Sequence, residues 1–426
     1  MDPVTLGMAK ADAAKKFAPL GQGSVPRFGR QDTSIVTNFE AGHGWTVQNA
    51  GGGTSNLNDT SAFAFGTQSV RLTTAGAGAS TIVEKLGIPA IPVGRMYRLW
   101  VKVDAPDTLN RVRVMLSDAP AFTSYYTLES FFSSAGIPEV QRPFKAGEWV
   151  PISLPWSIAV ATGSPVRGSL TNIRVLVNDR SVPATVRLGR LETMPDPVPL
   201  FPSGVVSLTY DDTFASAYTV VRPHLDKYGF AGTLFPILER FGQAGYLTTA
   251  QCDALAFTSG WEIGAHASTY AKHVQSVTGM TSAERVAEFT TLRAWQQARG
   301  YAASSFAYPN GTVDAATEFD LRKFYGTGRL ALGRFSATGA DEQQNPSIPT
   351  RIYAQNPGNL TLAQMKAEVD RAVANKSWLV FVFHDVLTTK VGANDVATAD
   401  HLALVDYIAA SGVAVRTMDQ VRNASL

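Results

Sequence analysis

The chain has 426 residues, a net charge of +2, and only 17% charged residues. A chain of this length exceeds one ordinary hydrophobic core, so we expect two or three domains. Lys and Arg are spread along the sequence rather than clustered, which argues against nucleic acid as a partner, and no acidic run indicates a disordered tail.

The sequence has few features that indicate disulfide bonds, secretion or membrane insertion. The single cysteine, Cys252, rules out an intrachain disulfide. The first residues lack the apolar core of a secretory signal peptide, and no later stretch approaches about eighteen consecutive apolar residues. We therefore expect neither a signal peptide nor a membrane span. A protein that acts outside the cell can still be released by lysis as part of a larger particle.

The N-terminal half begins with a segment of its own and then becomes rich in strand signals. Residues 1–30 predict a short helix, Ala9–Phe17, and a tether, which either attaches the chain to something else or has no role. Residues 31–194 show short alternating runs separated by turn residues, and this spacing predicts a β-sandwich. The expected strands are 34–40, 69–74, 96–105, 110–119, 149–156, 172–179 and 184–192.

This half resembles the jelly-roll modules found beside carbohydrate-active domains. The resemblance follows the order FEAGHGWT, FGTQSVRLTT, MYRLWVKV and AGEWVPISLPW. It implies either carbohydrate binding or a spacer and assembly role. Trp45, Tyr125, Tyr126 and Trp156 can stack on sugar rings, but aromatic side chains more often contribute to a core.

The segment 195–204 contains four prolines and predicts a semi-rigid linker. After it, residues 205–426 alternate between strand and helix signals. Such alternation predicts parallel strands joined by crossover helices and closed into a barrel. The expected strands are 205–210, 231–237, 261–266, 304–309, 378–385 and 413–418, and the expected helices are 215–228, 248–259, 282–299, a turn or more after Asp314, 362–375 and 396–411.

Polar residues recur where these strands end. The run VVSLTYDDTF delivers Asp211 and Asp212, and later strands end at His266 and His384. The carboxyl ends of parallel barrel strands meet at one mouth, so we expect these side chains to converge. Adjacent residues on a strand point to opposite faces, which gives the two aspartates different neighbours. The alternative is that Asp212 or Thr213 only caps the following helix.

An aspartate with two histidines is a common ligand set for a divalent ion such as Zn²⁺. The candidates are Asp212, His266 and His273. A lone histidine is more often a hydrogen-bonded structural residue, but its occurrence beside a strand-end aspartate favours a metal site.

The residues from 205 to 426 resemble the polysaccharide deacetylases of carbohydrate esterase family 4. These enzymes remove N-acetyl or O-acetyl groups from sugars within a distorted (β/α) barrel. TYDDT resembles the first family motif and implies Asp211 as general base and Asp212 as metal ligand. WEIGAHASTYAKH resembles the second motif. VFVFHD resembles the last motif and implies His384 as general acid.

Two departures from the family pattern matter. The second motif usually has histidines four residues apart, and here that position is Tyr270, whose phenol is a poor zinc ligand. The next candidate is His273, which a straight helix would place about 10.5 Å along its axis from His266. We predict a loop or broken turn between Ser268 and Lys272 that brings His273 back. Without it, the site has two protein ligands.

The other departure is at SFAYPNG, where the family commonly has an arginine in place of Ala307. Arg351 or Arg329 can supply that charge from another loop. The turn after Pro309 presents the backbone N–H of Asn310 as an oxyanion donor, or it is an ordinary Pro-Asn-Gly turn.

The resemblance implies metal-dependent hydrolysis of acetyl amides or esters on a bacterial cell-wall or capsule polysaccharide. The long histidine spacing resembles tail proteins of bacteriophages that infect actinobacteria, which implies a virion-tail or extracellular location, with other tail proteins or a second copy as partners. The alternative is an inactive carbohydrate-binding tail protein or adhesin. A glycoside hydrolase is disfavoured, because its two carboxylates normally lie on different strands.

Overall fold

The computed structural model describes residues 33–131, 144–331, 346 and 348–424. Among the described residues, one compact unit comprises 33–199 together with 346 and 348, and the other comprises 200–331 and 349–424. The first boundary, between Pro199 and Leu200, lies inside the segment predicted as a linker. The predicted helix Ala9–Phe17 lies outside the described residues. Within the described part of the chain, no helix has the length and apolar character needed to cross a membrane.

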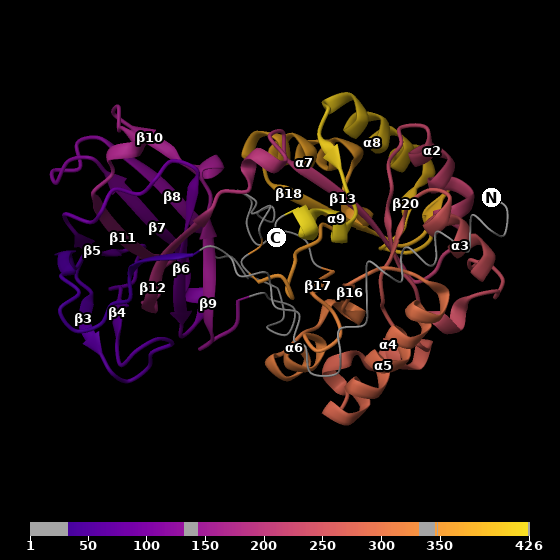
Figure 1. Ribbon diagram of the computed structural model, residues 1–426, viewed down its shortest axis with the longest axis horizontal. Helices are drawn as coiled ribbons and strands as arrows, with labels where there is room; N and C mark the ends of the chain where they lie inside the picture. The colour runs from indigo at the N-terminus through magenta and orange to yellow at the C-terminus, as the bar shows by residue number, and fades with distance from the viewer. Residues whose placement is uncertain (1–32, 132–143, 332–345, 347, 425–426) are drawn as a thin grey trace. The chain divides into compact units, whose positions relative to one another are not determined.

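The N-terminal unit contains two antiparallel sheets (Figure 1). One sheet has the order β3-β4-β12-β6-β9 with β1 on β12, and the other has the order β10-β8-β7-β11-β5-β2. The strands are β1 (Ser34–Thr37), β2 (Thr46–Asn49), β3 (Thr54–Asp59), β4 (Ser69–Thr73), β5 (Ser80–Lys85), β6 (Arg95–Val103), β7 (Leu109–Ser117), β8 (Tyr125–Phe131), β9 (Trp149–Leu154), β10 (Val160–Thr162), β11 (Asn172–Asp179) and β12 (Thr185–Pro195).

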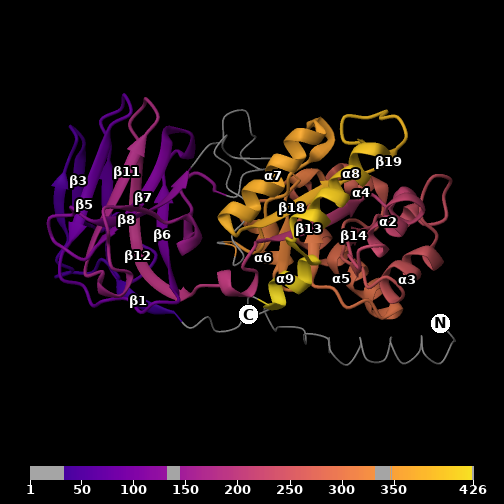
Figure 2. The same cartoon turned by 90° about the horizontal axis from the view of Figure 1, so that it is seen from above.

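A single core joins the two sheets. Along β6 the buried residues Leu99 and Val101 alternate with Trp100 and Lys102, as expected for a sheet with one wet face. Residues of β6 and β12 from one sheet share a hydrophobic cluster with residues of β7 and β11 from the other. The unit is therefore a sandwich of two antiparallel sheets, seen from a second direction in Figure 2. The jelly-roll subtype stays a prediction.

The four aromatic residues proposed for sugar stacking differ in exposure. Trp45 is a core residue with 3% of its surface exposed. Tyr126 and Trp156 are partly buried against the same core, and the Trp156 indole N–H donates to the backbone carbonyl of Arg95 over 2.5 Å. Tyr125 is partly exposed. A carbohydrate-binding role for this unit stays a prediction.

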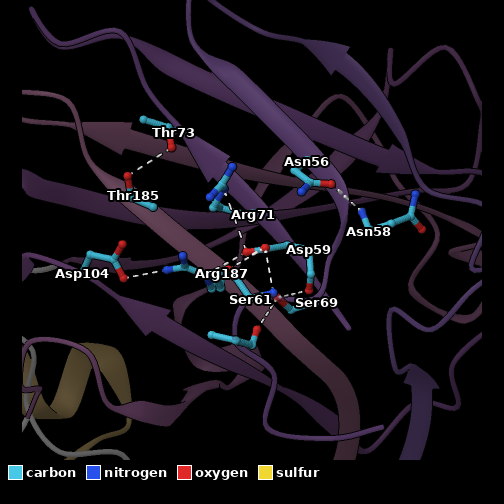
Figure 3. Close-up of polar contacts among 11 residues, drawn as sticks. Asn56, Asn58, Asp59, Ser61, Ser69, Arg71, Thr73, Asp104, Thr185 and Arg187 are labelled. Atoms are coloured by element: carbon cyan, nitrogen blue, oxygen red, sulfur yellow. Dashed lines mark hydrogen bonds and ion pairs between the residues drawn. The ribbon is translucent and has the colours of Figure 1, made fainter. Parts of the chain in front are cut away.

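A polar cluster around Asp59 ties together strands of the first sheet (Figure 3). The Asp59 carboxylate accepts from the Ser61 hydroxyl over 2.6 Å and from Arg187 Nε over 2.9 Å. Arg187 also donates to Asp104 over 2.7 Å. Each carboxylate oxygen of Asp59 therefore has a partner, so the buried charge is compensated.

The C-terminal unit alternates parallel strands and helices. Its strands are β13 (Val205–Asp211), β14 (Thr233–Phe235), β15 (Glu262–Ile263), β16 (Ser305–Ala307), β17 (Thr327–Arg329), β18 (Trp378–Phe383), β19 (Val386–Leu387), β20 (Val396–Ala397) and β21 (Ala414–Val415). Its helices are α2 (Arg222–Asp226), α3 (Thr249–Phe257), α4 (Tyr270–Gln275), α5 (Ser282–Arg299), α6 (Ala315–Leu321), α7 (Leu362–Asn375), α8 (Thr398–Ser411) and α9 (Met418–Ala424), with a π-helical turn, Ala217–Val221, before α2.

Parallel pairings close this unit into an irregular ring. β15, β14, β13 and β18 form a continuous ladder, and Ala265 pairs with Phe306 to join β15 to β16. β16 pairs with β17, whose Arg329 pairs with Ile352. Gln355 then pairs with Phe381 of β18, which completes the circuit. All residues of β13 and β18 are buried, as expected for strands covered on both faces.

The first residues of β14, β15 and β16 are polar, and their side chains are hydrogen-bonded to one another. Glu262 accepts from the Thr233 hydroxyl over 3.1 Å and from the backbone N–H of Asp419 over 2.9 Å, and it is hydrogen-bonded to Ser305. Burial, together with the neighbouring Asp419 carboxylate, raises the pKa of Glu262 to about 8. These hydrogen bonds link the starts of the three strands to one another and to α9.

Candidate metal centre and active site

The site begins at the sharp turn that follows β13. Asp211 is the last residue of the strand, and Asp212 and Thr213 have left-handed backbone conformations, with φ values of 66° and 71°. A β-branched residue rarely adopts this conformation, so the surroundings must stabilise it. Thr213 Oγ1 donates to the Ile237 carbonyl over 3.0 Å and accepts from the Ile237 N–H over 2.8 Å.

Three predicted ligands meet beside this turn. Asp212 Oδ1 lies 3.4 Å from His266 Nε2 and 3.4 Å from His273 Nε2. The three ligand atoms all lie within 4.8 Å of one another. Asp212 comes from the end of β13, His266 from just beyond β15, and His273 from α4, so residues far apart in the sequence form one triad.

The donor atoms of this triad fit a divalent cation. Asp212 Oδ1 is buried and has no hydrogen-bond partner within the described residues. His266 Nδ1 lies 2.8 Å from the Ala307 carbonyl, so a proton on Nδ1 donates there and leaves the lone pair of Nε2 facing Asp212. An unpartnered carboxylate oxygen between two imidazole nitrogens is a ligand set that Zn²⁺ accepts.

The electrostatics favour the protonation state of a ligand at Asp212 and at His273, whereas at His266 burial lowers the pKa but the Asp212 and Asp211 carboxylates raise it above its usual value. Burial opposes ionisation of Asp212, but the interactions with His266, His273 and His384 hold the pKa of Asp212 well below its usual range. Burial and the nearby His266 lower the pKa of His273 to about 4. His273 is therefore neutral near pH 7, as metal binding requires.

The chain bends between the two histidines. A bend occupies Ser268 and Thr269, and α4 begins at Tyr270, with the Thr269 hydroxyl accepting from the N–H of Lys272. We predicted the irregular segment between Ser268 and Lys272, and it ends earlier, because the Thr269 cap starts a regular helix. This bend places His273 Nε2 beside Asp212.

Tyr270 lies beside the triad, and nearly half of its surface, 48%, is exposed. Its ring stacks on the His273 ring with a centroid distance of 6.0 Å and an interplanar angle of 10°. The tyrosine therefore contacts a candidate ligand through its face, while the ligand nitrogen next to Asp212 comes from His273.

Asp211 is held by a buried arginine. Arg329 Nη2 lies 2.6 Å and 2.5 Å from the two carboxylate oxygens of Asp211, and Arg329 is fully buried. The other arginine that we considered, Arg351, instead pairs with Glu318 over 2.7 Å. Of the two arginines, Arg329 is therefore the one that pairs with Asp211.

His384 follows β18 at the same mouth and is partly exposed. Its charge contributes to lowering the pKa of both Asp212 and His273. Two carboxylates that we considered as partners for His384 have other partners: Asp385 accepts from Ser216 over 2.5 Å, and Asp419 accepts from Ser304 over 2.6 Å.

Asn310 lies in a tight turn after β16. Its backbone is left-handed, with a φ value of 57°, and its side chain donates to the backbone carbonyl of His273 over 3.0 Å. Sequence reasoning singled out the backbone N–H of Asn310 as an oxyanion donor, which stays a prediction. It missed the side-chain contact, which joins this turn to α4.

Part of the chain matches a known protein family. Residues 201–326 match the family model described as polysaccharide deacetylase, so this part of the chain is a polysaccharide deacetylase domain, and the enzymes of this family are hydrolases. The matched range includes Asp211, Asp212, His266 and His273 and ends before Arg329. No curated protein matches the chain.

Several solved structures are similar to the chain at low identity. A Streptococcus pyogenes deacetylase, PplD, in complex with acetate is 20% identical, with a TM-score of 0.28, and the match covers 35% of this chain and 64% of that one. A family 4 acetyl xylan esterase from Clostridium thermocellum with a cobalt ion is 18% identical, with a TM-score of 0.35 and coverages of 51% and 89%. A chitin deacetylase from the fungus Colletotrichum lindemuthianum is 16% identical, with a TM-score of 0.35 and coverages of 51% and 87%.

Proposed function

We propose that the protein is a metal-dependent deacetylase that hydrolyses acetyl amides or esters on an acetylated polysaccharide of a bacterial surface. The observation that carries this proposal is the convergence of Asp212, His266 and His273 on one point beside the arginine-held carboxylate of Asp211. The family match to residues 201–326 gives independent support for the reaction class.

The triad Asp212, His266 and His273 would hold a divalent cation, with Zn²⁺ as our choice from the ligand types. When bound, the cation supplies Lewis-acid stabilisation of the charge that develops on the acetyl oxygen. The Ala307 carbonyl orients the His266 ring, and the cap at Thr269 orients α4, which carries His273. The chain thus contributes three metal ligands and the contacts that orient two of them, His266 and His273.

The remaining steps are proton transfers and hydrogen bonds made by the protein. Asp211, held by Arg329, removes a proton from the attacking water. His384 at the end of β18 donates a proton to the leaving sugar nitrogen or oxygen. The backbone N–H of Asn310 donates a hydrogen bond to the developing oxyanion.

We also propose that the reaction takes place outside the cell, on a host envelope, with the protein as a component of a phage tail. The histidine spacing of the second motif and the strand-rich N-terminal half support this setting. Mass spectrometry of purified phage particles that carry this gene should find the protein in the tail fraction. Its absence from intact particles would reject the tail assignment and leave the catalytic proposal unchanged.

The catalytic proposal is tested with the purified full chain. Bound metal is measured by elemental mass spectrometry, and acetate release is measured on acetylated chito-oligosaccharide and acetylated xylan, before and after chelation. We expect bound metal, acetate release, and loss of activity on chelation that added Zn²⁺ restores. Absence of both metal and acetate release on every acetylated glycan would reject the proposal in favour of a binding protein.

The variant Asp211→Asn separates the proposed base from the ligands. We expect kcat to fall by about 10²–10⁴, the range for loss of a general base, with metal content unchanged. Loss of metal from Asp211→Asn would show that Asp211 belongs to the ligand set instead.

A further inference from the structure

The loop between β14 and α3 lies beside the metal triad. Ile237 pairs with Ala267, the residue after His266, and Tyr246 pairs with Phe214, two residues after Asp212. The N–H of Leu247 also donates to the carbonyl of Thr213 over 2.9 Å. This loop therefore brings its own side chains to the rim of the barrel mouth.

One of these side chains is a cation that rests on aromatic rings. Arg240 Cζ lies 4.1 Å from the centroid of the Tyr270 ring and 4.5 Å from that of Tyr246. Tyr270 in turn stacks on the candidate ligand His273, and Tyr246 stacks on Phe214 with a centroid distance of 5.3 Å. Only one aromatic ring thus separates the guanidinium from the triad.

Stacking on the two rings holds Arg240 in place without hydrogen bonds from its guanidinium N–H groups to the described residues. Within residues 33–131, 144–331, 346 and 348–424, its guanidinium makes no hydrogen bond or ion pair, and the side chain is partly exposed. The adjacent carboxylate of Glu239 accepts instead from the backbone N–H of Tyr270 over 2.7 Å. A guanidinium held by its face and open at its edge can donate two parallel hydrogen bonds to an oxyanion.

Arg222 shows what a comparable arginine does when its role is structural. Its Cζ lies 4.8 Å from the Tyr218 ring, so it also stacks on a tyrosine. Unlike Arg240, it pairs with Asp226 over 3.2 Å and donates to Ser259 over 2.8 Å. The unpaired state of Arg240 is thus not a general property of arginine–tyrosine stacks in this unit.

We propose that Arg240 is a specificity residue that binds an anionic group of the glycan, either a carboxylate or a phosphate, close to the acetyl group that is removed. This inference rests on the proposed deacetylase function and narrows its substrate class to acidic acetylated polysaccharides. A guanidinium that is positioned before the substrate arrives loses little side-chain freedom on binding.

The test compares matched tetrasaccharides built from acetylated amino sugars. One carries lactyl carboxylates, the second is the neutral methyl ester of the first, and the third is a chitotetraose whose only charged group is a 6-phosphate. Acetate release is measured for the wild type, Arg240→Gln, Arg240→Lys and the control Arg222→Gln. Thermal unfolding verifies that each variant folds.

We expect the wild type to have a KM about 5- to 30-fold lower for an anionic tetrasaccharide than for the ester. Arg240→Gln removes this preference and leaves the ester unchanged, Arg240→Lys retains part of it, and Arg222→Gln retains all of it. The anion that the wild type prefers identifies the group as carboxylate or phosphate. No preference in the wild type, or an equal loss on all substrates in Arg240→Gln, would overturn the inference.

A binding measurement separates failure of the deacetylase proposal from failure of the Arg240 proposal. If no tetrasaccharide releases acetate, binding of the same compounds is measured by isothermal titration calorimetry. Weaker binding of the anionic forms to Arg240→Gln than to the wild type would support the role of Arg240 in a binding protein. Equal binding, or none, would reject it.

Discussion

Buried carboxylate oxygens occur in both units, and their surroundings differ. In the sandwich, Asp59 accepts hydrogen bonds from Ser61 and Arg187 at both oxygens. In the barrel, Asp212 Oδ1 has two imidazoles at 3.4 Å and no hydrogen-bond partner within the described residues. The charge of Asp59 is therefore compensated by groups of the protein. The charge on Asp212 Oδ1 is left for a ligand that the chain itself does not supply.

The largest expected effect comes from removing the uncompensated charge. Asp212→Asn keeps the shape of the side chain but removes a charged ligand. Mutating a residue that only hydrogen-bonds to a metal ligand lowers metal affinity by about 10- to 100-fold, so we expect the loss of the ligand itself to lower it by more than about a hundred-fold. The metal-free protein should be at least as stable as the wild type. Titration with Zn²⁺ and thermal unfolding in chelator measure the two quantities, and a destabilised metal-free variant would contradict the comparison.

Glu262 is a third buried carboxylate, and it is surrounded by hydrogen-bond donors without a cationic partner among the residues that the structure describes. Its pKa of about 8 in the folded chain exceeds the ordinary value of 4.5, so the folded state retains a proton that the unfolded state releases. The stabilisation is complete below pH 4.5 and is lost as the pH rises to about 8, by on the order of 5 kcal/mol.

The pH dependence is measured by chemical denaturation at several values between pH 5 and 8.5. Glu262→Gln should lose most of this slope, because an amide cannot release the proton. An unchanged slope in the variant would place the titrating group elsewhere.

Asp59→Asn provides the complementary test in the sandwich. Removing a charge that is already compensated should lower the free energy of unfolding by about 1–3 kcal/mol, because Arg187 and Ser61 lose a charged acceptor. Metal affinity and acetate release should not change. Asp104→Asn is the matched control, since this carboxylate pairs with the same arginine but is 44% exposed, and its effect should stay below about 1 kcal/mol.

The smallest expected effect concerns the ring that stacks on His273. Tyr270→Ala removes an aromatic contact of about 0.5–1.5 kcal/mol, so metal affinity should fall about 2- to 12-fold. Tyr270→Phe keeps the ring and should bind metal as the wild type does. A metal affinity equal to the wild type in Tyr270→Ala would show that the bend and the Thr269 cap alone position His273.

Much of the site could be predicted because it follows long, apolar strands. The runs before Asp211 and His384 have an unambiguous pattern, and parallel strands bring their ends to one mouth. Arg329 was only one of two candidates, because β17 has three residues with a glycine at its centre and carries almost no strand signal. The family resemblance indicated that a positive charge was missing at Ala307, and the folded chain was needed to show its source.

The rim of the mouth could not be predicted for a different reason. Arg240 lies in an irregular loop whose position depends on single pairings at Ile237 and Tyr246, and such pairings have no periodicity in the sequence. The side-chain contact of Asn310 with the His273 carbonyl likewise joins a turn to a helix, α4, that is far from it in the chain. Contacts between loops follow from the packed structure rather than from local propensity.

The left-handed turn at Asp212 and Thr213 bears on any attempt to engineer this protein. Glycine adopts such a backbone without steric cost, so Asp212→Gly would relieve the conformation, whereas Thr213→Gly would also remove the two hydrogen bonds to Ile237. A directed-evolution screen that selects only for heat resistance would therefore enrich variants at Asp212. Because this residue carries a ligand atom, such a screen needs a parallel selection for bound metal.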